Sequence, residues 1–140
     1  MKKIAILTSG GDAPGMNAAI RAAVRCGIRK DMEVYGIHRG YEGLLDGEIT
    51  QFQWHSVGDI LQRGGTILKT ARSKRFMEEN WIDHGAKILK TFGIEGLIVI
   101  GGDGSLKGGI ELAKRGITVM GLPGTIDNDL AYTDYTIGFD

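Results

Sequence analysis

The residues best suited to chemistry in this sequence are two glycine pairs, each followed by an aspartate. Gly-Gly-Asp occupies residues 10–12 and Gly-Gly-Asp-Gly-Ser occupies residues 101–105, and an apolar stretch precedes each turn. Glycine pairs let backbone amides approach an anion closely, and the N-terminus of a following helix adds free NH groups and the positive end of its dipole. A carboxylate beside a bound phosphate needs a hard cation between the two anions. The pattern therefore predicts a phosphate site that uses Mg²⁺.

The turn at residues 101–105 matches neither of two common nucleotide-binding loops. It lacks the Gly-Lys-Ser/Thr of a Walker loop, and Lys107 occupies the place of the last glycine in the dinucleotide fingerprint. The alternative is a plain strand-to-helix turn in which Ser105 caps the helix and Asp103 is solvated. We favour the phosphate interpretation because the motif occurs twice.

A third cluster consists of Thr125, Asp127 and Asp129, which alternate along the chain after Pro123. In an extended loop these three side chains would point to the same side. Neighbouring carboxylates make one of the pair more basic, so the cluster could accept a proton from a substrate hydroxyl. The alternative is a turn whose Asp and Asn side chains satisfy their own backbone.

Positive charge is concentrated in two places. Arg21, Arg25 and Arg29 recur at helical spacing, which indicates either a solvated helix face or a phosphate-binding surface. The second group follows the Gly-Gly-Thr of residues 64–66 and allows the same two interpretations; it comprises Lys69, Arg72, Lys74 and Arg75. The three histidines lack metal-ligand spacing, and we assign them no role.

The apolar pattern predicts the elements that must position these residues. Strands are expected at residues 3–8, 33–37, 49–54, 97–100 and 117–122. Helices are expected at about 15–29, 57–62, 78–92 and 106–114, with a glycine-broken loop at 39–45. Strands that alternate with helices indicate the α/β class, with a mostly parallel sheet covered on both sides in three layers, αβα. Both glycine turns and the loop after Pro123 fall at carboxyl ends of strands, where such sheets bind ligands.

Composition narrows the class of protein further. With 140 residues and 42% hydrophobic content, the chain suits one globular domain that buries roughly two thirds of its unfolded surface. Lys plus Arg and Asp plus Glu balance at 17 each, so no net field draws the chain to nucleic acid or to a membrane. The single cysteine, Cys26, and the lack of a membrane-length apolar stretch indicate a cytoplasmic protein. The abrupt end at Asp140 leads us to expect part of a larger chain.

Four blocks of the sequence resemble, in order, the signatures of the bacterial type of the ATP-dependent 6-phosphofructokinase family. The blocks are residues 7–18, 100–105, 123–129 and 136–140, and the resemblance extends over essentially the whole chain. It implies phosphorylation of fructose 6-phosphate by ATP, giving fructose 1,6-bisphosphate in glycolysis. It also implies that residues 1–140 form the ATP-binding part of a Rossmann-like large domain, incomplete and without the carboxyl-terminal substrate domain. We therefore expect these residues alone to bind nucleotide weakly at best and to be inactive.

The resemblance also assigns roles to individual positions. It implies contacts with ATP at Gly11, Tyr41, Arg72, Ser73, Gly102, Asp103, Gly104 and Ser105, with Mg²⁺ served by Asp103. It implies a catalytic base at Asp127 with Thr125 beside it, and contacts with the sugar phosphate at Thr125, Ile126, Asp127 and Asp129. It implies an effector site for ADP or phosphoenolpyruvate at Arg21, Arg25 and Asp59, between subunits of a homotetramer.

The choice of phosphoryl donor depends on two glycines. Pyrophosphate-dependent relatives typically carry Asp at the position of Gly104 and Lys at that of Gly124, so the sequence favours ATP. A pyrophosphate-dependent phosphofructokinase remains an alternative, as does a nucleotide-binding or subunit-contact module without activity. NAD and lipid kinases share a Gly-Gly-Asp-Gly turn but are not expected to carry the block at residues 10–18.

The sequence departs from the family pattern at two further places. Trp54 stands where an effector-site arginine is common, which puts a normal allosteric response in doubt. Ser73-Lys74-Arg75 differs from the usual sequence, in which an aromatic residue or cysteine precedes Pro and Glu. Our hypothesis is that the two added positive charges offset the nucleotide stacking lost at Ser73.

Overall fold

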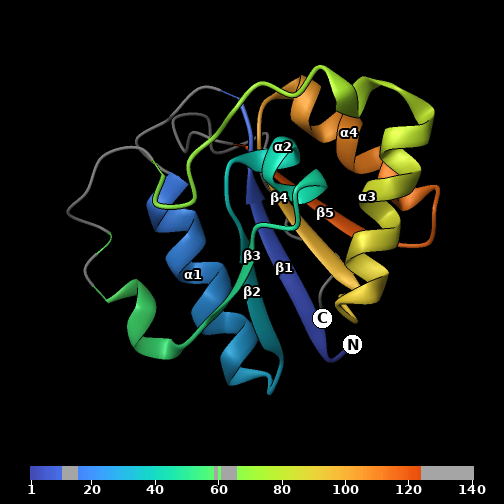
Figure 1. The fold of residues 1–140 in the computed structure, drawn as a ribbon. Coiled ribbons are helices and arrows are strands. Elements are labelled where there is room, and N and C mark those ends of the chain that lie inside the picture. Colours follow the sequence, from blue (N-terminus) through green and yellow to red (C-terminus); the bar gives the residue numbers. More distant parts are fainter. Residues whose placement is uncertain (11–15, 59, 61–65, 124–140) are drawn as a thin grey trace.

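The computed structural model describes residues 1–10, 16–58, 60 and 66–123. In this part of the chain five strands form one sheet in the order β3-β2-β1-β4-β5 (Figure 1). The strands are β1 (Lys3–Thr8), β2 (Glu33–Ile37), β3 (Ile49–Phe52), β4 (Gly96–Gly101) and β5 (Thr118–Pro123). Strands β2, β1, β4 and β5 pair in parallel, whereas β3 pairs antiparallel with β2 at the edge. The mostly parallel sheet predicted from the sequence is confirmed.

Helices cover both faces of this sheet. They are α1 (Met16–Arg29), α2 (Gly40–Leu45), α3 (Glu79–Thr91) and α4 (Asp103–Ala113), with short 3₁₀ turns η1 (Trp54–Val57) and η3 (Arg75–Met77). Helix α1 lies on one face and α2, α3 and α4 lie on the other (Figure 1). None of the described helices is long and apolar enough to cross a membrane.

Strand β1 explains why the sheet is buried on both sides. Its side chains alternate between two apolar clusters, with Ala5 and Leu7 in the cluster of α2, α3 and α4 and with Ile4 and Ile6 in the cluster of α1. Successive side chains of a strand point to opposite faces, so a strand covered twice has to be apolar throughout. The same holds for β4, all of whose residues are buried. The three-layer arrangement is therefore confirmed.

The expected loop at residues 39–45 is wrong, because residues Gly40–Leu45 form helix α2. Arg39 and Gly40 both have positive φ, at 61° and 59°, and turn the chain into the helix. Gly43 lies so close to the preceding turn that an added Cβ would meet the carbonyl oxygen of His38. Leu44 is fully buried. The glycines thus allow a tightly packed helix here, whose burial outweighs their weak helix propensity.

Several element boundaries also differ from the prediction. Helix α4 begins at Asp103, three residues before the expected start, and β5 extends through Pro123. Strand β3 ends at Phe52, and the 3₁₀ turn η1 occupies part of the expected continuation. Half of the helix expected at residues 57–62, namely residues 59, 61 and 62, falls outside the described residues.

Candidate nucleotide site

Gly10, the first residue of the first glycine turn, lies beside the second turn at the carboxyl end of the sheet. Strands β1 and β4 are parallel neighbours, and beyond their pairing the amide of Ser9 donates to the carbonyl oxygen of Ile100 at 2.9 Å. A Cβ added to Gly101 would lie 2.4 Å from the carbonyl oxygen of Ser9. One added to Gly10, whose φ is 89°, would lie 3.9 Å from the amide nitrogen of Gly102. The glycines are therefore what allows the turns to lie side by side.

Residues 101–105, which we call the α4 turn, carry the start of helix α4. Gly102 precedes the first helical residue in an extended conformation and makes no side-chain cap. Asp103 and Gly104 are exposed, and a Cβ added to Gly102 or Gly104 would meet nothing within 4 Å. Space is thus open around Gly102 and Gly104. The first amides of a helix have no partner within the helix, so this terminus suits an anion.

The expectation that Ser105 caps α4 is wrong. Ser105 lies inside the first turn of the helix and is buried, with 6% of its surface exposed. The helix starts earlier than predicted because Gly102 adopts the extended conformation of a cap residue without needing a side chain.

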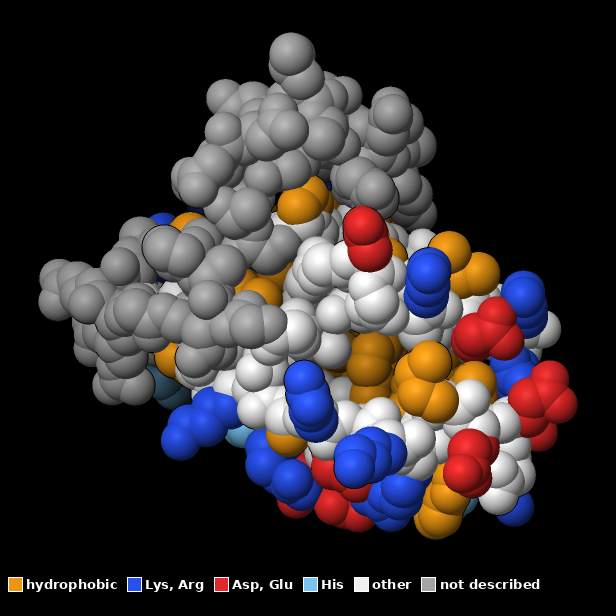
Figure 2. All heavy atoms as spheres, turned by 90° about the horizontal axis from the view of Figure 1, so that it is seen from above, with side chains coloured by type: hydrophobic (Ala, Val, Ile, Leu, Met, Phe, Trp, Pro, Cys, Tyr) orange, Lys and Arg blue, Asp and Glu red, His pale blue; other side chains and the backbone are white. Residues whose placement is uncertain are grey.

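A cleft of about 1010 Å³ opens beside the α4 turn. Figure 2 views this end of the sheet, where Lys and Arg side chains project around exposed backbone and apolar atoms. Five of the residues predicted to contact ATP line the cleft, namely Tyr41, Arg72, Ser73, Gly104 and Ser105. They come from α2, from α4 and from residues 66–78, which form one side of the cleft and which we call the cleft wall.

Tyr41 lies between the two sides of the cleft. Its ring stacks on Phe76 of the cleft wall, with centroids 4.2 Å apart and planes at 11°. Its hydroxyl donates to the carbonyl oxygen of Ser105 at 2.5 Å. The ring also leaves no room at Gly108, where an added Cβ would lie 2.8 Å from the Tyr41 ring. Burial raises the pKa of Tyr41, so its phenol stays neutral and serves as a packing surface and a donor.

Arg72 and Ser73 line the cleft from the wall. The Arg72 side chain is exposed, and among the described residues it forms no ion pair or hydrogen bond. The Ser73 hydroxyl is buried and lacks a partner among those same residues. A free guanidinium suits phosphate oxygens, which it can bind through two donors. The two residues are thus placed as a nucleotide site requires.

Asp103 is the predicted metal ligand, and it fits Mg²⁺ on chemical grounds. Its carboxylate is exposed in the first turn of α4, beside the open amides. Within the described ranges no group of three or more His, Cys, Asp or Glu is arranged to hold a metal. One carboxylate is sufficient for Mg²⁺, which keeps several waters and shares phosphate oxygens rather than needing a protein cage.

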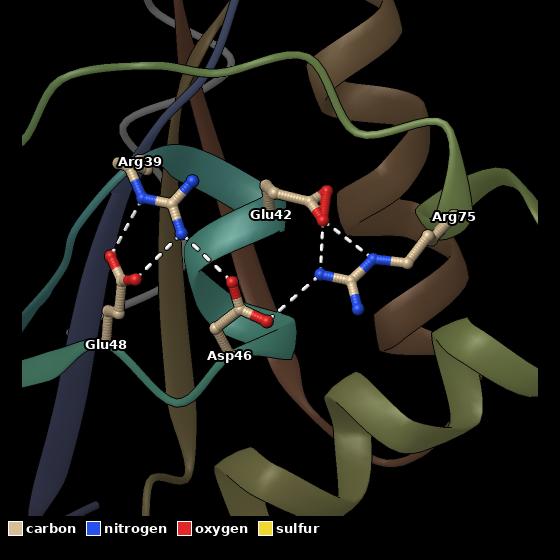
Figure 3. A network of polar contacts seen from close by, with 5 residues as sticks. All are labelled: Arg39, Glu42, Asp46, Glu48 and Arg75. Atoms are coloured by element: carbon tan, nitrogen blue, oxygen red, sulfur yellow. Dashed lines mark hydrogen bonds and ion pairs between the residues drawn. The ribbon is translucent and has the colours of Figure 1, made fainter.

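The hypothesis that Arg75 adds free positive charge for the nucleotide is wrong. Its guanidinium points to α2, where Nε donates to Glu42 at 2.6 Å and Nη2 donates to Asp46 at 3.1 Å (Figure 3). It also lies over the Trp81 ring, 4.8 Å from the centroid. The hydrogen bond from Arg75 holds the pKa of Asp46 below its usual value. The charge of Arg75 is therefore already compensated.

Sequence reasoning missed several residues of the cleft. Lys107, Gly108 and Glu111 line it from α4, and Phe76 and Met77 line it from the wall. A helical period counted from Gly104 would have found the three on α4, because residues three or four apart share one face. No comparable signal exists for the wall, whose only regular element is the three-residue turn η3.

Two of the predicted effector residues, Arg21 and Arg25, belong to α1 on the other face of the sheet. Arg25 and Arg29 of α1 lie over the ring of Trp54, at 4.8 and 5.2 Å from its centroid. The Nε atoms of Arg21 and Arg25 are buried and have no hydrogen-bond partner among the described residues. Six predicted site residues lie outside the described residues: Gly11, Asp59, Thr125, Ile126, Asp127 and Asp129.

Comparisons with known proteins agree on one family. The sequence profile of the family Phosphofructokinase matches residues 3–140. The chain is 66% identical over 140 residues to the ATP-dependent 6-phosphofructokinase of Clostridium botulinum (strain Hall), covering 100% of this chain and 44% of that protein. Its fold matches Pichia pastoris phosphofructokinase in the T-state with a TM-score of 0.86 and 42% identity, covering 91% of this chain and 16% of that one. The phosphofructokinase from Saccharomyces cerevisiae gives a TM-score of 0.83 at 41% identity, with 99% and 22% coverage.

Proposed function

The chain belongs to the phosphofructokinase family, and on this basis we propose that residues 1–140 form the ATP-binding part of an ATP-dependent 6-phosphofructokinase. The chain spans 44% of the length of the curated relatives it matches. The proposed reaction transfers the γ-phosphoryl group of ATP to fructose 6-phosphate and yields fructose 1,6-bisphosphate. One observation carries this proposal: Gly10 of the first turn and Gly104 and Ser105 of the α4 turn line one cleft, which five of the predicted ATP residues line.

In this proposal the α4 turn binds the phosphates of the nucleotide. The first amides of α4 donate to phosphate oxygens, and Arg72 adds a positive charge from the opposite side. Asp103 holds Mg²⁺, which when bound neutralises phosphate charge. The open space at Gly104 leaves room for the phosphates, and this supports ATP as the donor.

The proton of the sugar is taken by the loop after β5. Asp127 accepts the C1 hydroxyl proton as that oxygen forms its bond to the γ-phosphorus, and the bond from phosphorus to the bridging oxygen of ADP breaks. Thr125, Ile126 and Asp129 contact the sugar phosphate. The order of the sequence motifs supports these roles, and neighbouring carboxylates raise the basicity of one of them.

We extend the proposal to regulation and assembly. A homotetramer binds ADP or phosphoenolpyruvate at Arg21, Arg25 and Asp59, and the unpartnered Nε atoms of the two arginines support an anion site there. Trp54 already holds Arg25 by a cation–π contact, so we expect a weakened effector response. We also propose a cytoplasmic location, which the free thiol of Cys26 supports.

A chimeric enzyme tests the proposed function. Residues 1–140 replace the matching segment of the Clostridium botulinum relative, and a coupled assay measures turnover with ATP or pyrophosphate. We expect turnover with ATP and fructose 6-phosphate, and no turnover from residues 1–140 alone. Asp127→Ser should lower kcat on the order of 10²–10⁴-fold with little change in ATP affinity. Activity with pyrophosphate only, or equal losses in kcat and ATP affinity, would contradict the proposal.

A further inference from the structure

The cleft wall has no helix or strand at Arg72 and Ser73, the two wall residues predicted to contact the nucleotide. Within the described residues, Thr70, Ala71 and Arg72 form no hydrogen bond with the rest of the chain, and the Ser73 hydroxyl has no partner. A segment without such bonds takes its position from what holds its two ends. The contacts at those ends therefore decide where Arg72 lies.

The N-terminal end of the wall is fixed to the sheet. The hydroxyl of Thr8, the last residue of β1, donates to the carbonyl oxygen of Lys69 at 3.0 Å. The amide of Arg39 donates to the carbonyl oxygen of Leu68 at 2.8 Å. Both contacts use the wall's backbone, so they tolerate a change of most wall side chains.

The C-terminal end of the wall is fixed by side chains, chiefly that of Arg75. The guanidinium binds Glu42 and Asp46 of the α2 region (Figure 3). It also lies over the Trp81 ring of α3. Asp46 also accepts a hydrogen bond from Arg39 at 2.9 Å, so one carboxylate joins two arginines. A planar guanidinium with three fixed contacts has little freedom, and it holds the backbone of η3 against α2.

Phe76, the residue after Arg75, connects η3 to the other side of the cleft. Phe76 is buried and stacks on Tyr41, whose hydroxyl is bound to the carbonyl oxygen of Ser105 in the α4 turn. A displacement of η3 therefore changes the spacing between the wall and the α4 turn, the two sides that a nucleotide must contact at once.

We propose that Arg75 is a positioning residue for the nucleotide, which fixes the cleft wall through Glu42 and Asp46 and so sets the place of Arg72. The inference rests on the proposed function. Arg72 and Arg75 then have different roles, although they are close in sequence: Arg72 contacts the nucleotide, and Arg75 acts through the acidic side chains of α2. Its partners are partly exposed, so its effect weakens as salt concentration rises.

The test compares three neutralised cations in the intact protein, by steady-state kinetics with ATP at low and high salt. Arg75→Gln should raise the KM for ATP about fivefold to tenfold and leave kcat nearly unchanged. This size corresponds to the coupling energies between residues of one salt-bridge network. Lys74→Gln is the matched control, because the Lys74 side chain is exposed, forms no hydrogen bond or ion pair among the described residues and does not line the cleft. Its KM should stay within about twofold of the wild type. Arg72→Gln should raise the KM most and at all salt concentrations.

Pairing with Glu42 is tested by a double-mutant cycle. If Arg75 acts through Glu42, the double variant Arg75→Gln with Glu42→Gln should raise the KM for ATP little more than either substitution alone. The exchanged pair Arg75→Glu with Glu42→Arg should recover part of the lost affinity. Additive losses without recovery would mean that Arg75 acts on the nucleotide directly, and would overturn the proposal.

Hydrogen exchange gives a readout that does not depend on activity. Arg75→Gln should speed exchange of the amides of residues 70–77 and leave the amides of β1 and β4 unchanged, whereas Lys74→Gln should change neither. Faster exchange throughout the sheet would indicate a general loss of stability and would contradict a positioning role. A normal KM in Arg75→Gln with an impaired Arg72→Gln overturns this inference alone. A normal KM in both variants counts against the proposed function itself.

Discussion

The α4 turn and the cleft wall face each other across one cleft, yet they are held in place by different means. The α4 turn is fixed by backbone geometry, because β4 continues into a glycine that lies against Ser9 and then into a helix. The wall is fixed at one end by the side chains of Arg75 and Phe76. The α4 turn should therefore be sensitive where its backbone is in close contact, at Gly101, whereas the position of the wall can be altered by changing single charges.

The largest effect is expected at Gly101, where the backbone leaves no room. Gly101→Ala places a Cβ 2.4 Å from the carbonyl oxygen of Ser9, so the two glycine turns must separate. We expect a loss of about 1–3 kcal/mol in the free energy of unfolding, with loss of ATP binding. Gly102→Ala is the control, since a Cβ there meets nothing within 4 Å. Chemical denaturation of both variants measures the difference, and equal stabilities would show that close packing does not fix this turn.

The next largest effect is expected from a negative charge added to the α4 turn, rather than from added volume. Gly104→Asp should weaken ATP binding at least tenfold, about 1.4 kcal/mol, because a carboxylate would face the phosphates. Stability should change little, since nothing lies within 4 Å of the added Cβ. Gly104→Asn has the same size without the charge and separates repulsion from crowding. Calorimetric titration with ATP measures both variants, and an equal loss in the two would assign the effect to size.

A smaller effect is expected where the two sides are joined. Tyr41→Phe keeps the stack on Phe76 but removes the hydrogen bond to Ser105, and should lower the free energy of unfolding by about 1 kcal/mol. Tyr35→Phe is the control, because the Tyr35 hydroxyl donates only to exposed Glu33, at 2.7 Å. Thermal unfolding of both variants tests this. A loss at Tyr41 no larger than the loss at Tyr35 would contradict a contribution from the buried hydrogen bond.

The smallest effect is a pH dependence at Asp46, the residue after α2 that pairs with Arg75 of the wall. The pKa of Asp46 is lowered in the folded protein, first by the hydrogen bond from Arg75. Its contribution to stability is therefore complete above its unfolded pKa of about 3.9 and is lost as pH falls through the folded value below that. The difference in Tm between the wild type and Asp46→Asn should be largest near pH 6 and shrink below about pH 4. A difference that is constant over this range would exclude the ion pair as its cause.

The same contrast explains how much the sequence could predict. The sequence pattern predicted strands β1 and β4 and the glycine turns that follow them. It also predicted the end of α3 at Gly93, whose φ is 76°. Each of these features depends on a local apolar pattern or on a glycine. The position of the α4 turn at the end of β4 was therefore predicted, although α4 begins three residues earlier than expected and Ser105 does not cap it.

The cleft wall and α2 could not be predicted in this way. Whether Gly40 and Gly43 belong to a loop or a helix depends on burial of Leu44 and Leu45 against α3, which no local pattern records. Arg75 was misinterpreted because its partners Glu42 and Asp46 lie some thirty residues earlier in the chain. The role of a charged side chain can be assigned only when its hydrogen-bond and ion-pair partners are known.

The most direct measurement is a crystal structure of the intact protein with Mg²⁺ and a non-hydrolysable ATP analogue. We expect the triphosphate to bind the amides of residues 102–105, with the Asp103 carboxylate turned toward the metal. The guanidinium of Arg72 should contact the same phosphates, while Arg75 keeps its hydrogen bonds to Glu42 and Asp46. A triphosphate bound away from the α4 turn, or one gripped by Arg75 itself, would contradict this expectation.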